Sequence, residues 1–271
     1  AFGIASGVSP SQGILTAIIG GFIVSALGGS RVQIGGPTGA FIVIIYGIVS
    51  DPNLGLSGLM LATMLAGIFL ILLGVCHLGT IIKFIPYPIV VGFTSGIAVT
   101  IFTTQIKDLF GLTIAGKMPG DFLSKWLVYF QNFDTVDWVT TAVGVLSILI
   151  IALTPKVSKK VPGSLVAIIV MTIGVYFLNT YTDMKVLTIG DQFGEIKASI
   201  PSLQVPNLSW ESVKSLFPTA MVIAVLGAIE SLLSATVADG VCGDHHNSNQ
   251  ELIGQGVANL CTPLFGGIPC T

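Results

Sequence analysis

The 271-residue chain is strongly apolar: 52% of its residues are hydrophobic, only 9% are charged, and its mean hydropathy is +0.92. A soluble domain carries about 25% charged residues, so this composition excludes an ordinary soluble protein. The net charge of -2 indicates no nucleic-acid partner, and we expect an all-α polytopic protein embedded in the lipid bilayer.

Apolar runs of about the length that crosses a bilayer alternate with polar segments along the chain. Residues 107–136 are polar and aromatic, which indicates an amphipathic surface helix around Trp126, Tyr129 and Phe130, and residues 77–88 suit the membrane interface. Two polar loops are predicted, at residues 179–211, with candidate strands at 186–187 and 196–200, and at residues 239–250. The predicted spans are residues 12–27, 54–75, 89–105, 137–153, 165–178 and 213–237, with another helix beginning in 252–260.

Basic residues orient these spans, because cytoplasmic loops carry an excess of Lys and Arg. Lys156, Lys159 and Lys160 form the densest basic cluster, which predicts a cytoplasmic position. Counting spans backward places Arg31 and Lys83 on the same side. Counting forward places residues 179–211 outside the cell and residues 243–250 inside it.

The stretch from Val32 to Phe41 predicts a helix that begins partway through the membrane. Gly35-Gly36 interrupts regular structure, and Pro37 suits the first helical position. A helix from Pro37 to Ser50 would cover about 21 Å, short of a hydrocarbon core of about 30 Å, so an extended segment must cover the rest. Its first N–H groups and its positive dipole end would then point into a cavity, which is an anion site.

A second interruption of the same kind lies at residues 263–271, with Gly266-Gly267, Pro269 and Thr271 after an apolar helix. Two interrupted segments at corresponding places in two halves of a chain point to a transporter binding site. The alternative is a pair of ordinary Gly/Pro kinks, which are common in membrane helices.

Glu230 lies deep in the apolar run 213–237, where a carboxylate is costly and faces a cavity or a partner. Helical spacing places Gly227, Ser231 and Ser234 on or near the same face. We therefore predict that Glu230 takes up a proton or holds Na⁺; the alternative is a structural carboxylate that only accepts hydrogen bonds.

Other reactive residues predict no metal site and no cofactor beyond a coupling ion. The metal-ligand types in the 239–250 loop lack spaced partners, and Asp239 is expected to close a helix end or pair with a basic residue. The cysteines lack paired metal spacing and are expected to be reduced. These residues are Asp239, Asp244, His245 and His246, and Cys76, Cys242, Cys261 and Cys270.

Several strings together resemble the SulP family of anion transporters, also called solute carrier family 26. They lie at residues 26–40, 85–88, 92–98 and 105–108, and most specifically at 227–252. The resemblance implies a fold of two inverted seven-helix repeats, divided into a core and a gate domain, with the anion between the starts of helices 3 and 10. Here those starts match Pro37 and the neighbourhood of Thr271.

By this match the chain is part of a transmembrane domain, from the end of helix 1 to the start of helix 10, without the C-terminal helices and the STAS domain. Residues 1–75 and 213–271 would belong to the core and residues 76–180 to the gate. Residues 181–212 would form an extracellular loop.

The function we expect is secondary active transport of a small inorganic or carboxylate anion across the bacterial inner membrane, by a protein that forms a homodimer at full length. The N–H groups of Thr38, Gly39, Ala40 and Phe41 would bind the anion, facing Thr271 and the residues past it. Glu230 falls where bacterial symporters of the family carry a coupling carboxylate, and Ser234 fills the hydroxyl position four residues later. Glu rather than Asp favours H⁺ over Na⁺.

Sulfate is the first candidate for the anion, followed by bicarbonate or a dicarboxylate with Na⁺ as the coupling ion. An uncoupled anion channel or motor-like protein on the same scaffold is an alternative, and so is a nucleobase transporter with an inverted-repeat fold. We expect no enzymatic activity, because the sequence presents no nucleophile–base pair or metal cluster at one membrane depth.

Overall fold

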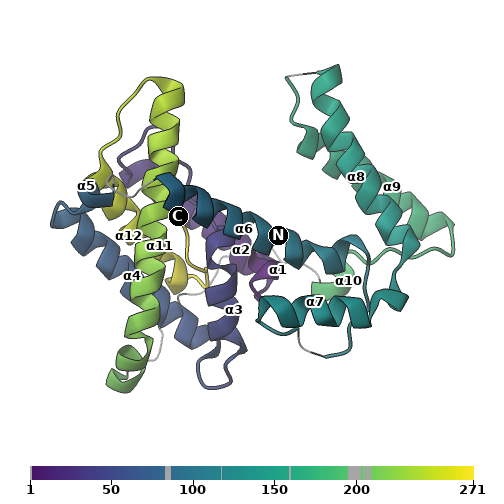
Figure 1. Cartoon of the computed structure of the whole chain (residues 1–271), viewed down its shortest axis with the longest axis horizontal. Helices are drawn as coiled ribbons and strands as arrows, with labels where there is room; N and C mark the ends of the chain where they lie inside the picture. The colour runs from purple at the N-terminus through teal and green to yellow at the C-terminus, as the bar shows by residue number, and fades with distance from the viewer. Residues whose placement is uncertain are drawn as a thin grey trace. The chain divides into compact units, whose positions relative to one another are not determined.

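The computed structural model describes residues 2–82, 87–116, 118–158, 160–194, 203, 205 and 209–271. Within these ranges the regular structure is helical, apart from an isolated β-bridge. The chain divides into two compact units, Ala1–Ile97 with Ile196–Thr271, and Ala98–Glu195. Figure 1 shows the helices of both units.

In the first unit, α12 packs against both α4 and α2, and α11 packs along α4. The helices of this unit are α1 (Phe2–Ala5), α2 (Pro10–Leu27), η1 (Gly39–Phe41), α3 (Ile42–Ser50), α4 (Gly55–Val75), α5 (Gly79–Ile82), the first part of α6 (Tyr87–Leu109), α11 (Trp210–Cys242) and α12 (Ser248–Leu264).

The second unit continues α6 and contains a helical hairpin in which α8 packs against α9. Its other elements include a short aromatic helix, α7, that carries Trp126, Tyr129 and Phe130 as predicted. The bounds are α7 (Phe122–Gln131), η2 (Phe133–Thr135), α8 (Trp138–Val157), α9 (Gly163–Tyr181) and α10 (Ile189–Phe193).

Five helices of the described residues are long and apolar enough to cross a membrane: α2, α4, α8, α9 and α11. They coincide with predicted spans, and the shorter apolar stretch Gly39–Ser50 adds the expected broken helix. The all-α, multi-pass class predicted from composition is therefore confirmed.

Polar residues in the connecting segments set where several helices begin. Ser9 and Gln12 form a reciprocal capping box at the start of α2. Asp137 accepts the N–H groups of Val139 and Thr140 at the start of α8, and Asn247 accepts that of Gln250 at the start of α12. Each cap satisfies helix N–H groups that have no partner inside the helix.

Glycine lets α4 and α12 approach closely. A Cβ atom on Gly67 would lie 2.7 Å from the carbonyl oxygen of Gly256 and 2.9 Å from the backbone nitrogen of Leu260. A Cβ atom on Gly256 would likewise lie 2.7 Å from the Gly67 carbonyl oxygen. Small residues drive such packing in membranes, where the hydrophobic effect does not favour contact between helices.

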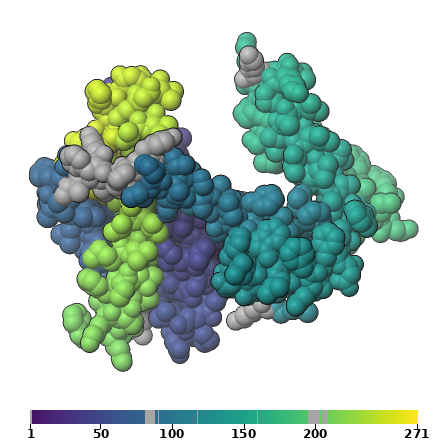
Figure 2. Space-filling view, in the orientation of Figure 1, coloured from purple at the N-terminus to yellow at the C-terminus, as the bar shows by residue number. Residues whose placement is uncertain are grey.

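Apolar side chains of η1, α3, α4 and α11 contribute to the core of the first unit, including Phe41, Ile45, Leu70 and Ile223. On the opposite side α11 presents exposed apolar residues, which suit lipid or further protein, and Figure 2 shows the outer face of this helix in light green. These exposed residues include Phe217, Met221, Val222 and Val225.

Two of the predicted loops are shorter in the structure than expected, so their predicted bounds were wrong. The predicted loop 239–250 is only residues 243–247, because α11 continues to Cys242 and α12 starts at Ser248. Gly243 ends α11 in the left-handed conformation, with φ of 67°. The predicted loop 179–211 is shortened by the last turn of α9 and by α10.

The strand predicted at residues 186–187 is absent from the structure. The backbone N–H and carbonyl of Val186 instead bond the side-chain amide of Asn179, each at 2.9 Å, so they need no strand partner. The strand predicted at 196–200, the interfacial residues 83–86 and Lys159 lie outside the described residues.

Candidate functional site

Two extended segments far apart in sequence meet inside the first unit: the first is residues 29–38 and the second is residues 265–271. The N–H of Gly36 donates to the Thr271 carbonyl at 2.9 Å, and the N–H of Thr271 donates to the Gly36 carbonyl at 3.1 Å. Pro37 and Cys270 form the resulting antiparallel bridge. The two Gly/Pro interruptions therefore pair with each other, which satisfies backbone groups that a membrane interior would leave without water.

The first broken helix begins two residues later than predicted. Thr38 is extended, with φ of -119° and ψ of 156°, and its hydroxyl accepts the N–H of Ala40 at 3.3 Å. Helical structure starts at Gly39 with one 3₁₀ turn and continues as α3. Pro37 is not the first helical residue, because its neighbour Gly36 is held in the bridge to Thr271.

Side chains from α2 and α12 hold the second extended segment. The Thr16 hydroxyl accepts the N–H of Ile268 at 2.7 Å. The Asn259 amide accepts the N–H of Cys270 at 3.0 Å and donates to the Cys270 carbonyl at 2.7 Å. Thr271 is thereby directed toward Thr38 and α11.

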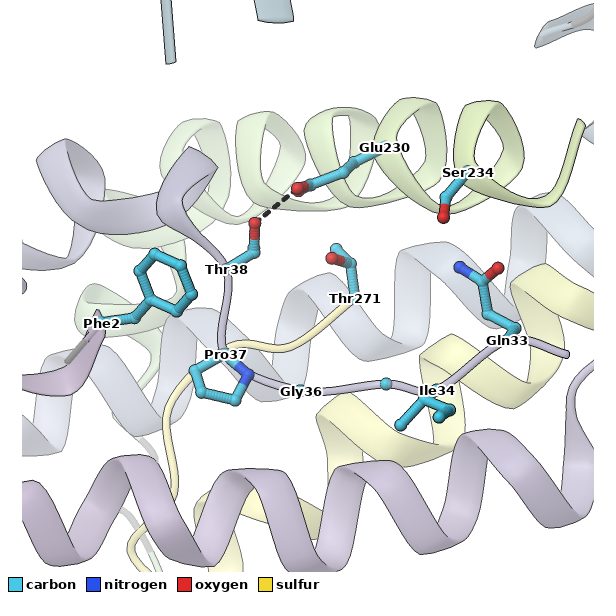
Figure 3. A pocket seen from close by; sticks show the side chains of 10 residues that line it. Phe2, Gln33, Ile34, Gly36, Pro37, Thr38, Glu230, Ser234 and Thr271 are labelled. Atoms are coloured by element: carbon cyan, nitrogen blue, oxygen red, sulfur yellow. Dashed lines mark hydrogen bonds between the residues drawn. The ribbon is translucent and has the colours of Figure 1, made fainter. Parts of the chain in front are cut away.

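Glu230 of α11 faces this junction, as Figure 3 shows. Its Oε1 accepts the hydroxyl of Thr38 at 2.5 Å. Its Oε2 is buried and has no hydrogen-bond partner among the described residues. A buried carboxylate oxygen without a donor is unfavourable, so this atom is suited to receive a proton or a cation.

A pocket of about 300 Å³ lies at this junction, between the first extended segment, Thr271 and α11. Glu230 is the charged side chain among its lining residues, and no Lys or Arg of the described part of the chain lines it. An anion in this pocket would therefore depend on backbone N–H dipoles and on neutralisation of Glu230. The lining residues are Phe2, Gln33, Ile34, Gly35, Gly36, Pro37, Thr38, Glu230, Ser234 and Thr271.

Four of the predicted site residues line this pocket, namely Thr38, Thr271, Glu230 and Ser234. The other three, Gly39, Ala40 and Phe41, do not line it. The N–H of Ala40 already donates to Thr38. Phe41 is 1% exposed in the apolar core.

Sequence reasoning missed two buried polar residues. Gln33 lines the pocket, and Figure 3 shows its amide below Ser234. Glu251 is fully buried and accepts hydrogen bonds from three segments, including the N–H of Gly29 at 2.8 Å. Gln33 was visible as a polar residue within an apolar stretch, whereas Glu251 follows a polar run and reads as a helix-start carboxylate.

The acidic and histidine residues in the last turn of α11 and just after it make local contacts. His246 lies between Asp239, 2.6 Å from its Nδ1, and Ser248, 3.0 Å from its Nε2. Asp244 lies 3.9 Å from Arg31 on the surface. Asp239 therefore links the end of α11 to the segment before α12.

The model of the sulfate permease family matches residues 1–271. The chain is 45% identical over its whole length to "Putative sulfate transporter YvdB" of Bacillus subtilis, of which it covers 50%. It is 32% identical over 99% of its length to the bicarbonate transporter BicA of a Picosynechococcus species, of which it covers 48%.

Among solved structures, the transmembrane domain of a cyanobacterial bicarbonate transporter BicA superimposes with a TM-score of 0.85 at 31% identity. The match covers 100% of this chain and 69% of that one. The chain spans about half the length of the relatives it matches.

The fold and site define a multi-pass membrane protein with a helix that starts inside the bundle beside a buried carboxylate. The chain belongs to the sulfate permease family, also known as SulP or solute carrier family 26. The resemblance of its motifs to that family is thereby confirmed.

Proposed function

We propose that this chain forms the anion-binding part of a secondary active transporter, with proton-coupled sulfate symport as the leading function. The observation that carries the proposal is the pocket in which Thr38, Thr271 and the Glu230 carboxylate converge. The sulfate transporter named among the relatives supports sulfate as the first substrate.

The electrostatics of the pocket suggest how transport is coupled. An anion and an ionised Glu230 repel each other, and none of the described residues that line the pocket is basic and could offset this repulsion. A proton on Glu230 would remove the repulsion, and the free Oε2 atom is available to receive it. Anion and proton would then bind together and be released together, which is symport.

The anion would lie in the pocket beside Thr38 and Thr271, just before η1, where the positive end of the dipole of η1 and α3 would attract it. In the proposal, residues 1–75 and 213–271 form the moving core, and residues 76–180 belong to the gate. The full-length protein would carry the anion by moving the core against the gate. We place it in the bacterial inner membrane as a homodimer, with no catalytic role.

Na⁺-coupled bicarbonate transport is the second candidate, because a relative at 32% identity is named a bicarbonate transporter. Ser234 supports it, since its hydroxyl shares the pocket with Glu230 and oxygen atoms are the ligands that hard cations prefer. Dicarboxylate transport and an uncoupled channel remain alternatives for the same pocket.

Uptake of radiolabelled sulfate into proteoliposomes containing the full-length protein tests the proposal. An inward proton gradient without Na⁺ should stimulate uptake, and excess unlabelled sulfate should compete. Uptake that ignores the gradient would contradict coupling and favour a channel. No sulfate uptake, with Na⁺-stimulated uptake of labelled bicarbonate, would establish the second candidate instead.

A further inference from the structure

A stripe of buried polar side chains runs along one face of α12. Glu251, Gln255 and Asn259 are four residues apart and are 0%, 0% and 1% exposed. None of them lines the pocket. Burying three polar side chains on one helix face is unfavourable unless they form hydrogen bonds, so their partners are informative.

Glu251 binds two separate parts of the unit with its two carboxylate oxygens. Its Oε2 accepts the N–H groups of Gly29 at 2.8 Å and Ser30 at 3.2 Å, where the first extended segment begins. Its Oε1 accepts the hydroxyl of Ser231 at 3.0 Å. Ser231 follows Glu230 on α11, so one side chain ties both walls of the pocket to α12.

Gln255 orients Glu251. Its Nε2 donates to Oε1 of Glu251 at 3.1 Å, while its own Oε1 is buried without a partner among the described residues. Among the described residues four groups donate to the Glu251 carboxylate: the N–H groups of Gly29 and Ser30 on one oxygen, and the Ser231 hydroxyl and the Gln255 amide on the other. A side chain without acceptor oxygens in its place would leave these donors unpaired.

Asn259 bonds the backbone of the second extended segment, as Glu251 bonds the backbone of the first. Its amide bonds both the N–H and the carbonyl of Cys270, and its Nδ2 also donates to the Gln255 carbonyl at 2.9 Å. The next residue, Thr271, pairs with Gly36 of the first segment. The stripe therefore holds the first extended segment where it begins and the second extended segment where it ends.

Where the first extended segment begins, its backbone packs tightly against the residue before α12. A Cβ atom on Gly29 would lie 2.0 Å from the Asn247 carbonyl oxygen, and the N–H of Asn247 donates to the Gly29 carbonyl at 2.9 Å. The first extended segment is thus fixed to the start of α12 before it reaches Thr38.

We propose that Glu251 and Asn259 are positioning residues of the anion site: they set the places of Thr38 and Thr271 relative to Glu230 without contacting the substrate. Their role in transport rests on the proposed function, whereas their effect on the two segments does not. The competing explanation is that the stripe only stabilises the fold, without a particular effect on the site.

Hydrogen–deuterium exchange of the full-length protein in nanodiscs separates these explanations. The variants Glu251→Met and Asn259→Asp nearly preserve size, so both should fold. Glu251→Met removes the acceptor of the Gly29 and Ser30 N–H groups, and Asn259→Asp removes the donor to the Cys270 carbonyl. The control is Glu211→Gln, at an exposed position in the first turn of α11.

We expect exchange to quicken at least tenfold in residues 29–36 for Glu251→Met and in residues 265–271 for Asn259→Asp, with residues 59–70 of α4 unchanged. Equal acceleration in α4 would show general destabilisation and overturn the proposal. Unchanged exchange in both segments would overturn it as well.

Transport supplies the second readout. Both variants should raise the apparent KM for labelled sulfate at least tenfold, and the Glu211→Gln control should not. Wild-type KM values in both variants would overturn the positioning role. If the unmodified protein takes up no sulfate, the proposed substrate fails, and the exchange experiment still decides whether the stripe positions the two segments.

Discussion

At the scale of single residues, the contact between Thr38 and Glu230 joins the first broken helix to α11. The Thr38 hydroxyl donates to Glu230 and also accepts the N–H of Ala40. One side chain thus caps the helix start and holds the carboxylate. Substitutions at these two positions should separate anion binding from coupling.

Thr38→Val should weaken anion transport while Thr38→Ser retains it. Valine keeps the shape but loses both hydrogen bonds, and an ordinary hydrogen bond contributes about 0.5–1.5 kcal/mol. We expect apparent KM to rise about tenfold or more, since about 1.4 kcal/mol is a factor of ten. The measurement is initial uptake by each variant at varied anion concentration; equal KM values for Val and Ser would contradict a role for the hydroxyl.

Glu230→Gln should abolish stimulation by the coupling gradient. Glutamine cannot exchange a proton at the pocket, yet it keeps the length of the side chain and can still accept a bond from Thr38. Uptake with and without a proton gradient measures the effect. Full gradient-driven uptake by this variant would remove Glu230 from the mechanism, and Glu211→Gln is the matched control for loss of a carboxylate on α11.

At the scale of elements, the close contact of α4 with α12 supports the site, because α12 carries the residues that hold both extended segments. The contact depends on glycine at positions where added atoms would meet backbone. At Gly67, two backbone atoms of α12 would lie within 2.9 Å of an added Cβ atom.

Gly67→Ala should destabilise the protein by about 1–3 kcal/mol, the usual effect of forcing extra atoms into a packed interior. Gly47→Ala on α3 is the control, since a Cβ there meets nothing within 4 Å. Alanine favours a helix more than glycine does, so the control should be neutral or slightly stabilising. Thermal unfolding of the purified full-length variants compares the two, and equal midpoints would contradict the packing argument.

At the scale of the whole molecule, the positive-inside pattern predicts which loops face the cytoplasm. The segment after α9 should lie outside and the segment after α11 inside, because α11 crosses between them. This topology rests on Lys156 and Lys160 before α9, both of which are exposed.

Cysteine labelling of intact cells tests the topology. In a full-length variant freed of other cysteines, a cysteine replacing Asp183 should react with a membrane-impermeant maleimide. Cys242, retained alone in a second variant, should react only after the membrane is permeabilised; it is exposed at the end of α11. Labelling of Cys242 in intact cells would reverse the assigned orientation.

Much of this protein was predictable from the sequence. Apolar runs required helices across the bilayer, because only internally hydrogen-bonded structures survive there. Gly35-Gly36 and Gly266-Gly267 marked both interruptions, and the isolated charge of Glu230 marked the carboxylate at the pocket. These inferences depend only on which residues are neighbours along the chain, and that can be read directly from the sequence.

Only the tertiary structure decided how the interruptions are used. Gly36 and Thr271 pair across 235 positions of chain, and Glu251 bonds Gly29 across a separation of 222. Neither partnership leaves a periodic signal, because a hydrogen bond between distant segments depends on packing rather than on spacing. For the same reason the helix start moved from Pro37 to Gly39: the pairing of Gly36 with Thr271 outweighed the preference of proline for a first helical turn.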